Sequence, residues 1–142
     1  MTYLIAGEGK DLDRLERLAR ECDVVEHVRF LGKVPPEDLP DLYRAADLFA
    51  LPSTGEGFGI AYLEAMACGT PAIGLSLGGV PDALGDGKLG TCVSPEDFPQ
   101  AFIEALQHCR ERRDGLPERV RERFDFQIFA SRLQMLLRPL LN

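Results

Sequence analysis

Short apolar segments alternate along the chain with segments whose apolar residues recur every three or four positions. The short segments predict buried strands at residues 3–6, 27–31, 47–51, 71–75 and 90–93. The periodic segments predict helices near residues 12–22, 39–46, 60–68 and 98–109, and in the tail 116–142. Strands that alternate with helices pair in parallel, because each crossover needs a helix. The predicted fold is therefore α/β, a doubly wound parallel sheet with helices on both faces.

The length and composition are typical of one globular domain. The chain has 142 residues, of which 45% are hydrophobic and 27% are charged. We expect a single domain over residues 1–142, with a helical tail from residue 116. An apolar stripe runs along that tail, and its exposure would favour self-association. Its members are Phe126, Phe129, Leu133, Leu136 and Leu140.

Charge and cysteine usage narrow the classes of partner. The net charge of −7 argues against general nucleic-acid binding. The chain shows no signal-peptide pattern and no uncharged apolar run of about 20 residues. The arginines between residues 110 and 123 alternate with acids, which favours a salt-bridged helix surface over contact with a membrane.

Four cysteines and two histidines offer no spacing typical of a metal site, so we expect no metal. The cysteines are interpreted as small buried side chains in a reducing cytosol, which predicts a cytoplasmic protein.

The segment 52–59 carries the clearest candidate chemistry. Ligands of such folds bind beyond the carboxyl ends of the strands, where this loop joins a predicted strand to a predicted helix. Gly57 and Gly59 would let the backbone approach a ligand. The free N–H groups and the dipole at the helix start favour an anion such as a phosphate. An ordinary turn would explain the loop equally well by itself.

An isolated acid in the predicted apolar helix favours a ligand site over an ordinary turn. Glu64 is the one charged residue between Gly57 and Pro81, and its helix is apolar on nearly every side, which predicts a buried helix. A buried carboxylate needs hydrogen-bond donors or a counter-charge. Two adjacent ribose hydroxyls would satisfy it, as would a distant arginine. Glu56 would lie on the other side of the anion site, unless it is an exposed loop acid.

The spacing of these two acids resembles a known family signature. The segment PSTGEGFGIAYLEAMACGTP (residues 52–71) places seven residues between Glu56 and Glu64. It is similar to the signature of GT4-type retaining glycosyltransferases, the glycosyl transferases group 1 of GT-B fold. The flanking segments FLGKV, LYRAAD and GGVPD resemble family blocks in the expected order, and the resemblance covers residues 3 to about 110.

The resemblance implies the Rossmann-like C-terminal half of a GT-B enzyme, which binds a nucleotide-sugar donor such as a UDP-, GDP- or ADP-sugar. Glu56 would be the catalytic residue that contacts the transferred sugar, and Glu64 would hold the ribose hydroxyls. The family works with retention of configuration and with neither metal nor cofactor. The other donor-binding positions implied are Gly57, Phe58, Gly59, Ile60, Lys33 and Val34.

The chain also departs from the family pattern. The first strand of this half, with the Arg and Lys that grip the diphosphate, is missing, and so is the N-terminal acceptor half. We therefore expect the isolated chain to be inactive, or nearly so. A non-catalytic module that binds a nucleotide or sugar phosphate is the alternative. A sugar-nucleotide epimerase would need other acid–base residues.

Overall fold

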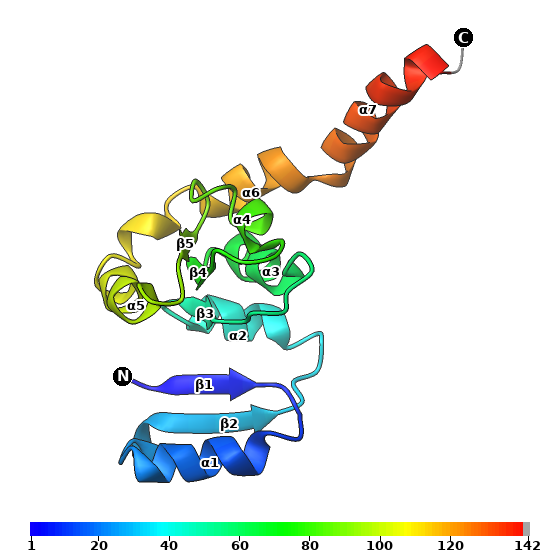
Figure 1. The fold of residues 1–142 in the computed structure, drawn as a ribbon. Coiled ribbons are helices and arrows are strands. Elements are labelled where there is room, and N and C mark those ends of the chain that lie inside the picture. Colours follow the sequence, from blue (N-terminus) through cyan, green and yellow to red (C-terminus); the bar gives the residue numbers. More distant parts are fainter. Residues whose placement is uncertain (141–142) are drawn as a thin grey trace. The chain divides into compact units, whose positions relative to one another are not determined.

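The computed structural model describes residues 1–140 (Figure 1). Leu140 belongs to the final turn, but its side chain and residues 141–142, all part of the predicted tail, lie outside what is described. The chain forms two compact units, residues 1–39 and the residues from 40 onward. Each unit is described by itself below.

The first unit is a strand–helix–strand segment. Its elements are β1 (Tyr3–Ala6), α1 (Leu12–Glu21), a 3-10 turn (Val25–His27) and β2 (Val28–Gly32). Strands β1 and β2 pair in parallel, with Tyr3 opposite Val28 and a register shift after Ile5. The N–H of Gly7 continues this ladder by donating to the carbonyl of Gly32 at 2.8 Å. Helix α1 therefore supplies the crossover that parallel pairing requires.

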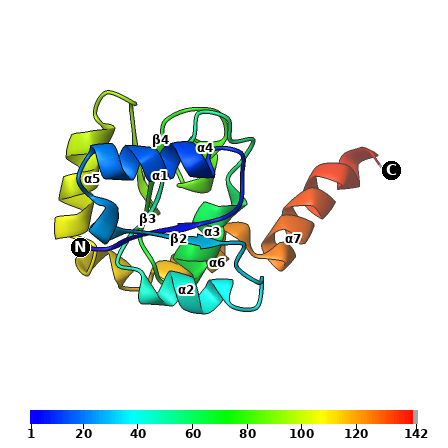
Figure 2. The ribbon, with the colours of Figure 1, turned by 90° about the horizontal axis from the view of Figure 1, so that it is seen from below.

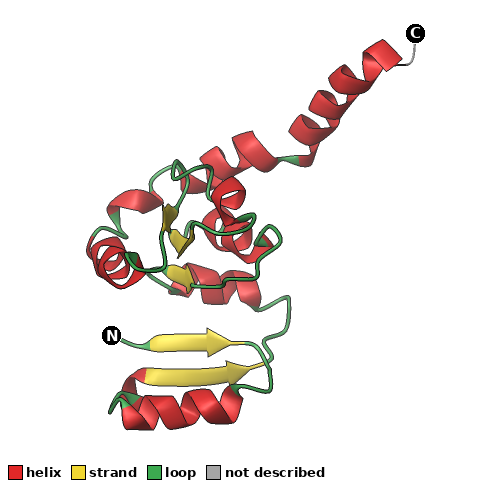
Figure 3. Ribbon diagram, viewed as in Figure 1, coloured by secondary structure: helices red, strands yellow, loops and turns green. Residues whose placement is uncertain are grey.

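The second unit is built on a three-stranded parallel sheet in the order β3–β4–β5. Strand β4 (Ala72–Leu75) is central and all four of its residues are buried. Figure 3 shows the short strands alternating with helices. The remaining elements are α2 (Leu39–Ala45), β3 (Phe49–Leu51), α3 (Ile60–Ala67), α4 (Val80–Ala83), β5 (Thr91–Val93), α5 (Phe98–Gln107), α6 (Leu116–Phe124), α7 (Phe126–Leu137) and 3-10 turns at Glu111–Arg113 and Arg138–Leu140.

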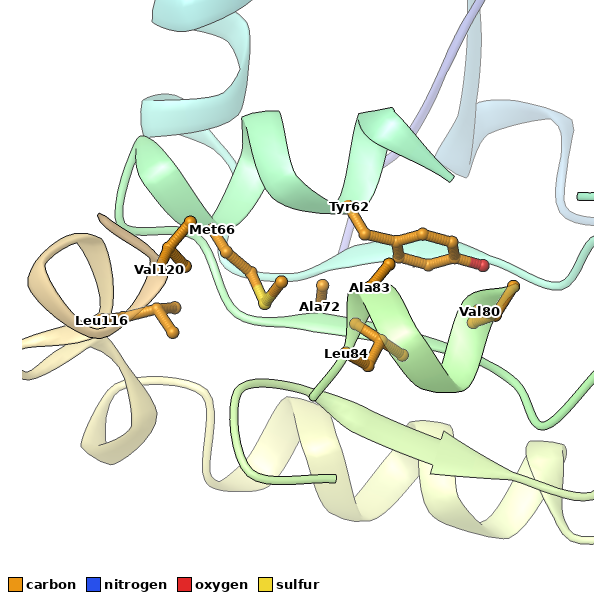
Figure 4. Packing of buried hydrophobic residues seen from close by; sticks show 8 residues of the cluster. All are labelled: Tyr62, Met66, Ala72, Val80, Ala83, Leu84, Leu116 and Val120. Atoms are coloured by element: carbon orange, nitrogen blue, oxygen red, sulfur yellow. The ribbon is translucent and has the colours of Figure 1, made fainter. Parts of the chain in front are cut away.

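The core of this unit lies between α3, β4, α4 and α6. Figure 4 shows Tyr62 and Met66 reaching from α3 toward the side chains of β4 and α4. Both side chains are fully buried, and burying side chains of this size contributes about 1.5–3 kcal/mol each. The full set is Tyr62, Met66, Ala72, Val80, Ala83, Leu84, Leu116 and Val120. The core fixes α3, and with it the loop that precedes α3.

The parallel α/β prediction is confirmed, and each predicted strand and helix has a counterpart within one or two residues. Two features were not predicted. The short helix α4 follows the glycines after β4. The tail divides into α6 and α7 at Asp125, because its side chain accepts from the N–H of Gln127 and starts a new helix there.

Three burial predictions were wrong. Among the strands of residues 1–140 only β4 is fully buried, whereas β1 is mostly exposed and β2, β3 and β5 are half-buried or alternate with exposed residues. Helix α3 is not buried on every side, because Ile60, Glu64 and Ala67 form an exposed face at helical spacing. Among the cysteines only Cys109 is buried. Cys22 is exposed because it follows the last turn of α1 in the small first unit, and Cys68 and Cys92 are half-buried.

The apolar side of α7 is exposed. Phe126 is 72% exposed and Leu136 is 74% exposed. No helix within residues 1–140 is long and apolar enough to cross a membrane.

Candidate functional site

Two loops that follow neighbouring parallel strands touch through their backbones. The N–H of Gly79, after β4, donates to the carbonyl oxygen of Glu56, after β3, at 3.3 Å. A Cβ at Gly78 would overlap that carbonyl oxygen, and a Cβ at Gly79 would overlap the carbonyl oxygen of Gly57. Both positions therefore need glycine, because any side chain would push the two loops apart. The contact holds Glu56 and Gly57 at the carboxyl edge of the sheet.

Tyr62 packs against the end of the same loop, at the start of α3. Gly59, which caps the N-terminus of α3, has a φ of +89°, and a Cβ there would lie 2.5 Å from Cδ2 of Tyr62. A Cβ at Gly74 on β4 would overlap the Tyr62 hydroxyl. That hydroxyl donates to the carbonyl oxygen of Leu51, the last residue of β3. One side chain thus joins the end of β3, the middle of β4 and the start of α3.

The start of α3 presents backbone donors. Within residues 1–140, no hydrogen bond of the structure uses the N–H groups of Gly57, Phe58, Gly59 or Ile60 as donors. Gly55 and Gly57 face open space. Unpaired N–H groups at a helix start, together with the helix dipole, make a site that can accept an anion. The loop can therefore hold phosphate oxygens or sugar hydroxyls without a basic side chain.

Glu64 lies one turn inside α3, on its exposed face. Its Oε2 accepts a hydrogen bond from the hydroxyl of Tyr43 at 3.1 Å. Tyr43 belongs to α2, and both Figure 1 and Figure 2 show α2 beside α3. In the described part of the chain, no arginine or lysine pairs with Glu64. The carboxylate is thus held by one neutral donor, and it remains open to solvent.

Two tyrosines, Tyr62 on α3 and Tyr43 on the neighbouring α2, have raised pKa values. Burial raises the pKa of Tyr43 to about 12, and the hydrogen bond to Glu64 adds to the rise. Burial also raises the pKa of Tyr62 to about 12, with a further contribution from the negative charge of Glu56. Glu56 itself is half-buried. Both phenols therefore stay protonated at neutral pH and act as donors.

The remaining predicted positions fall elsewhere. Lys33 and Val34 lie after β2, in the first unit, where Lys33 is exposed and Val34 is half-buried.

A groove of about 620 Å³ lies on another part of the second unit, between α4, α6 and α7. Its lining includes Asp82, Arg123 and Phe126, but neither Glu64 nor any residue of 56–60. The ring of Phe58 packs edge-on against Phe124 with 6.0 Å between centroids, so the loop and the groove share one wall. We place the candidate site at the loop, because the chemically distinctive groups are there. Among residues 1–140, no group of three or more His, Cys, Asp or Glu side chains is placed to hold a metal.

Three supporting positions escaped the sequence reasoning. Tyr43, Tyr62 and the Gly78–Gly79 pair act through contacts with residues 11 to 23 positions away. The pair lies in a segment that resembled a family block, which was the one signal available for it. Tyr43 lies in the LYRAAD segment and Tyr62 in the segment 52–71, which also resembled family blocks, but nothing in either segment separates these two side chains from ordinary core aromatics.

Comparison with known proteins gives one family. The model of the family "Glycosyl transferases group 1" matches residues 1–124. D-inositol 3-phosphate glycosyltransferase of Corynebacterium jeikeium is 47% identical over 98 residues, which are 69% of this chain and 23% of that protein. A GDP-mannose-dependent alpha-(1-6)-phosphatidylinositol monomannoside mannosyltransferase of Mycolicibacterium smegmatis is 43% identical over 100 residues, 66% of this chain and 26% of that protein.

Two solved structures are also similar to this chain over most of its length. Sucrose-phosphate synthase from Thermosynechococcus elongatus is similar over 97% of this chain and 38% of its own, with a TM-score of 0.76 and 29% identity. HepE of Anabaena in complex with UDP-glucose is similar over 97% of this chain and 41% of its own, with a TM-score of 0.76 and 25% identity. The chain spans about a quarter of the length of the curated relatives it matches.

Proposed function

The chain belongs to the group 1 glycosyltransferases, and from that premise we propose that it is the donor-binding part of a GT4-type, retaining enzyme. Such an enzyme moves a sugar from a nucleotide diphosphate sugar to an acceptor. The match of residues 1–124 to the family and the likeness to a structure that holds UDP-glucose support a nucleotide-sugar donor. The free thiols of the described cysteines agree with the cytoplasmic location that we assign to the protein.

The observation that carries this proposal is the environment of Glu64. A glutamate in an apolar helix is exposed, is held by a phenol and has no basic partner among the described residues. A carboxylate offers about four lone-pair positions, of which Tyr43 occupies one. The two adjacent hydroxyls of a ribose can donate to the others. We therefore assign Glu64 to the ribose of the donor.

The loop before α3 would bind the rest of the donor. The backbone N–H groups of residues 57–60 would donate to the diphosphate and to the sugar hydroxyls. They would favour the charge that develops on the departing diphosphate, since fixed dipoles stabilise such charge without rearranging. Glu56, held half-buried by the contact with Gly79, would orient the transferred sugar and stabilise it at the reacting carbon. Lys33 and Val34 would contact the base.

We propose that this chemistry needs neither metal nor cofactor, and that residues 1–142 alone do not transfer sugar. No lysine or arginine of the described residues bonds to the loop 52–59, so in this proposal backbone N–H groups supply the contacts with the diphosphate. The chain also spans about a quarter of its curated relatives, so a surface for an acceptor would lie in other parts of a longer protein.

Calorimetric titration with UDP-, GDP- and ADP-sugars and with the matching nucleoside diphosphates tests the proposal. One class of nucleotide sugar should bind, more tightly than its diphosphate alone. Glu56→Ala should abolish that difference and leave diphosphate binding intact, because Glu56 contacts only the sugar. Glu122→Ala, which removes an exposed glutamate from α6, is the matched control and should change neither affinity.

Three results would count against the proposal. Absence of binding by every nucleotide sugar would remove the donor site. An unchanged difference between sugar and diphosphate in Glu56→Ala would remove the role of Glu56. Turnover by residues 1–142 with an added acceptor would contradict the expected lack of transfer.

A further inference from the structure

We propose that Tyr43 is a positioning residue of the donor site, whose hydroxyl holds the Glu64 carboxylate in the orientation that receives the ribose. The inference rests on the proposed function, because it assumes that Glu64 binds the ribose hydroxyls. It adds a residue outside the loop, from a different helix and 21 positions away along the chain.

The contact is a hydrogen bond slightly longer than the usual O–H···O distance. The Tyr43 oxygen lies 3.1 Å from Oε2 of Glu64, and the phenol is the donor. Raised by burial and by Glu64 itself, the pKa of Tyr43 is about 12, so the donor keeps its proton throughout the neutral range. One oxygen of the carboxylate is thereby occupied, and the other remains available.

Tyr43 is itself fixed at two further points. Its ring meets Phe49 edge-on at 5.6 Å and 81°, and Phe49 meets Tyr62 in the same way at 5.5 Å and 84°. The hydroxyl of the fully buried Thr70 donates to the Tyr43 carbonyl oxygen. The phenol is therefore anchored to the core that also supports the loop before α3, so it provides a fixed point rather than a second mobile group.

Glu64 needs a fixed hydrogen-bond donor because its side chain is exposed. A glutamate in solvent samples many rotamers, and ordering it opposes the binding of a ligand. A donor that orders the carboxylate before the ligand arrives reduces this cost. The same donor leaves the remaining lone pairs of the carboxylate free. A lysine or arginine would instead neutralise the charge of the carboxylate and cover those lone pairs.

A double-mutant cycle on the binding of a nucleoside diphosphate tests the inference, with UDP as the probe or, where the titration above selects another base, the diphosphate of that base in its place. Tyr43→Phe keeps the ring against Phe49 and removes the hydroxyl alone. It should weaken UDP binding about threefold to tenfold, the effect of one ordinary hydrogen bond. In the background of Glu64→Ala, Tyr43→Phe should have no further effect, since no carboxylate remains to be oriented. Tyr3→Phe, which removes a phenol from β1, is the matched control and should bind UDP like the parent chain.

The outcomes distinguish failure of the role of Tyr43 from failure of the ribose contact proposed for Glu64. Equal losses from Tyr43→Phe with and without Glu64 would overturn the inference, because Tyr43 would then act through the fold and not through the carboxylate. The inference also fails, with the proposed function intact, if Glu64→Ala weakens UDP binding and Tyr43→Phe does not. If Glu64→Ala binds UDP like the parent chain, the assigned ribose contact fails, and the inference fails with it.

Thermal unfolding of each variant shows whether the fold is kept. If Tyr43→Phe does not fold, Glu64→Asp replaces it, because an exposed aspartate leaves the core untouched and withdraws the carboxylate from Tyr43 by one methylene. Glu64→Asp should then weaken UDP binding by a similar factor. An unchanged affinity would overturn the inference.

Discussion

Gly79 lies where the backbones of the loops after β3 and β4 touch without a side chain between them. Its N–H reaches the carbonyl oxygen of Glu56, and its Cα faces the carbonyl oxygen of Gly57. The position of Glu56 thus depends on a residue that carries no functional group.

Gly79→Ala should therefore cost about 1–3 kcal/mol of unfolding free energy, the usual effect of overpacking, and should weaken donor binding through the displaced loop. Chemical denaturation and titration with the donor measure the two effects. Gly9→Ala is the control, since a Cβ there meets no atom within 4 Å. Parent-like stability in Gly79→Ala would show that the loops can separate without cost.

At the same scale, the sequence singles out Glu64 as a lone acid and predicts its burial incorrectly. A lone charge in an apolar helix marks a special position, which spacing alone can detect. The expected burial followed from the composition of α3, but Ile60, Glu64 and Ala67 share one face, and that face is exposed. The donor from Tyr43 depends on how α2 packs beside α3, and no local pattern encodes that packing.

Among the elements, α3 owes its position to Tyr62. The buried hydroxyl bonds to the end of β3, and the ring occupies the space left by glycines on β4 and at the helix cap. Tyr62→Phe leaves the Leu51 carbonyl without this donor and should cost about 1–3 kcal/mol of unfolding free energy.

The raised pKa of Tyr62, about 12 against 10.0 for a free tyrosine, also sets a pH dependence. Its contribution to stability is complete below pH 10 and is lost as the pH rises through 12, because the unfolded chain ionises first. Denaturation between pH 9 and 12 should show a shallower decline for Tyr62→Phe than for the parent chain. Tyr43 keeps part of the decline in both. An identical decline in the two proteins would contradict the assignment to Tyr62.

The order and type of the elements could be predicted, because strong apolar periodicity and glycine boundaries fix them locally. The short helix α4 could not, since its four residues are too few for a periodic pattern. The break between α6 and α7 depends on a capping contact of Asp125 between two helical segments that adjoin directly, which no periodic pattern marks.

For the whole molecule, the family match and the parallel α/β fold agree with the interpretation of the sequence. The class of donor, the retention of configuration and the roles of individual residues stay proposals. The predicted self-association also stays a prediction. Its premise, an exposed apolar side on the tail, holds for Phe126, Phe129 and Leu136.

The central claim is that Glu64 receives the ribose hydroxyls, and removing those hydroxyls from the ligand tests it most directly. Calorimetric titration compares UDP with 2′,3′-dideoxy-UDP on the parent chain and on Glu64→Ala. We predict that the parent chain binds UDP at least about tenfold more tightly than the dideoxy analogue, as expected for hydrogen bonds to a charged group. Glu64→Ala should bind both equally. A preference for UDP that survives in Glu64→Ala would contradict the claim.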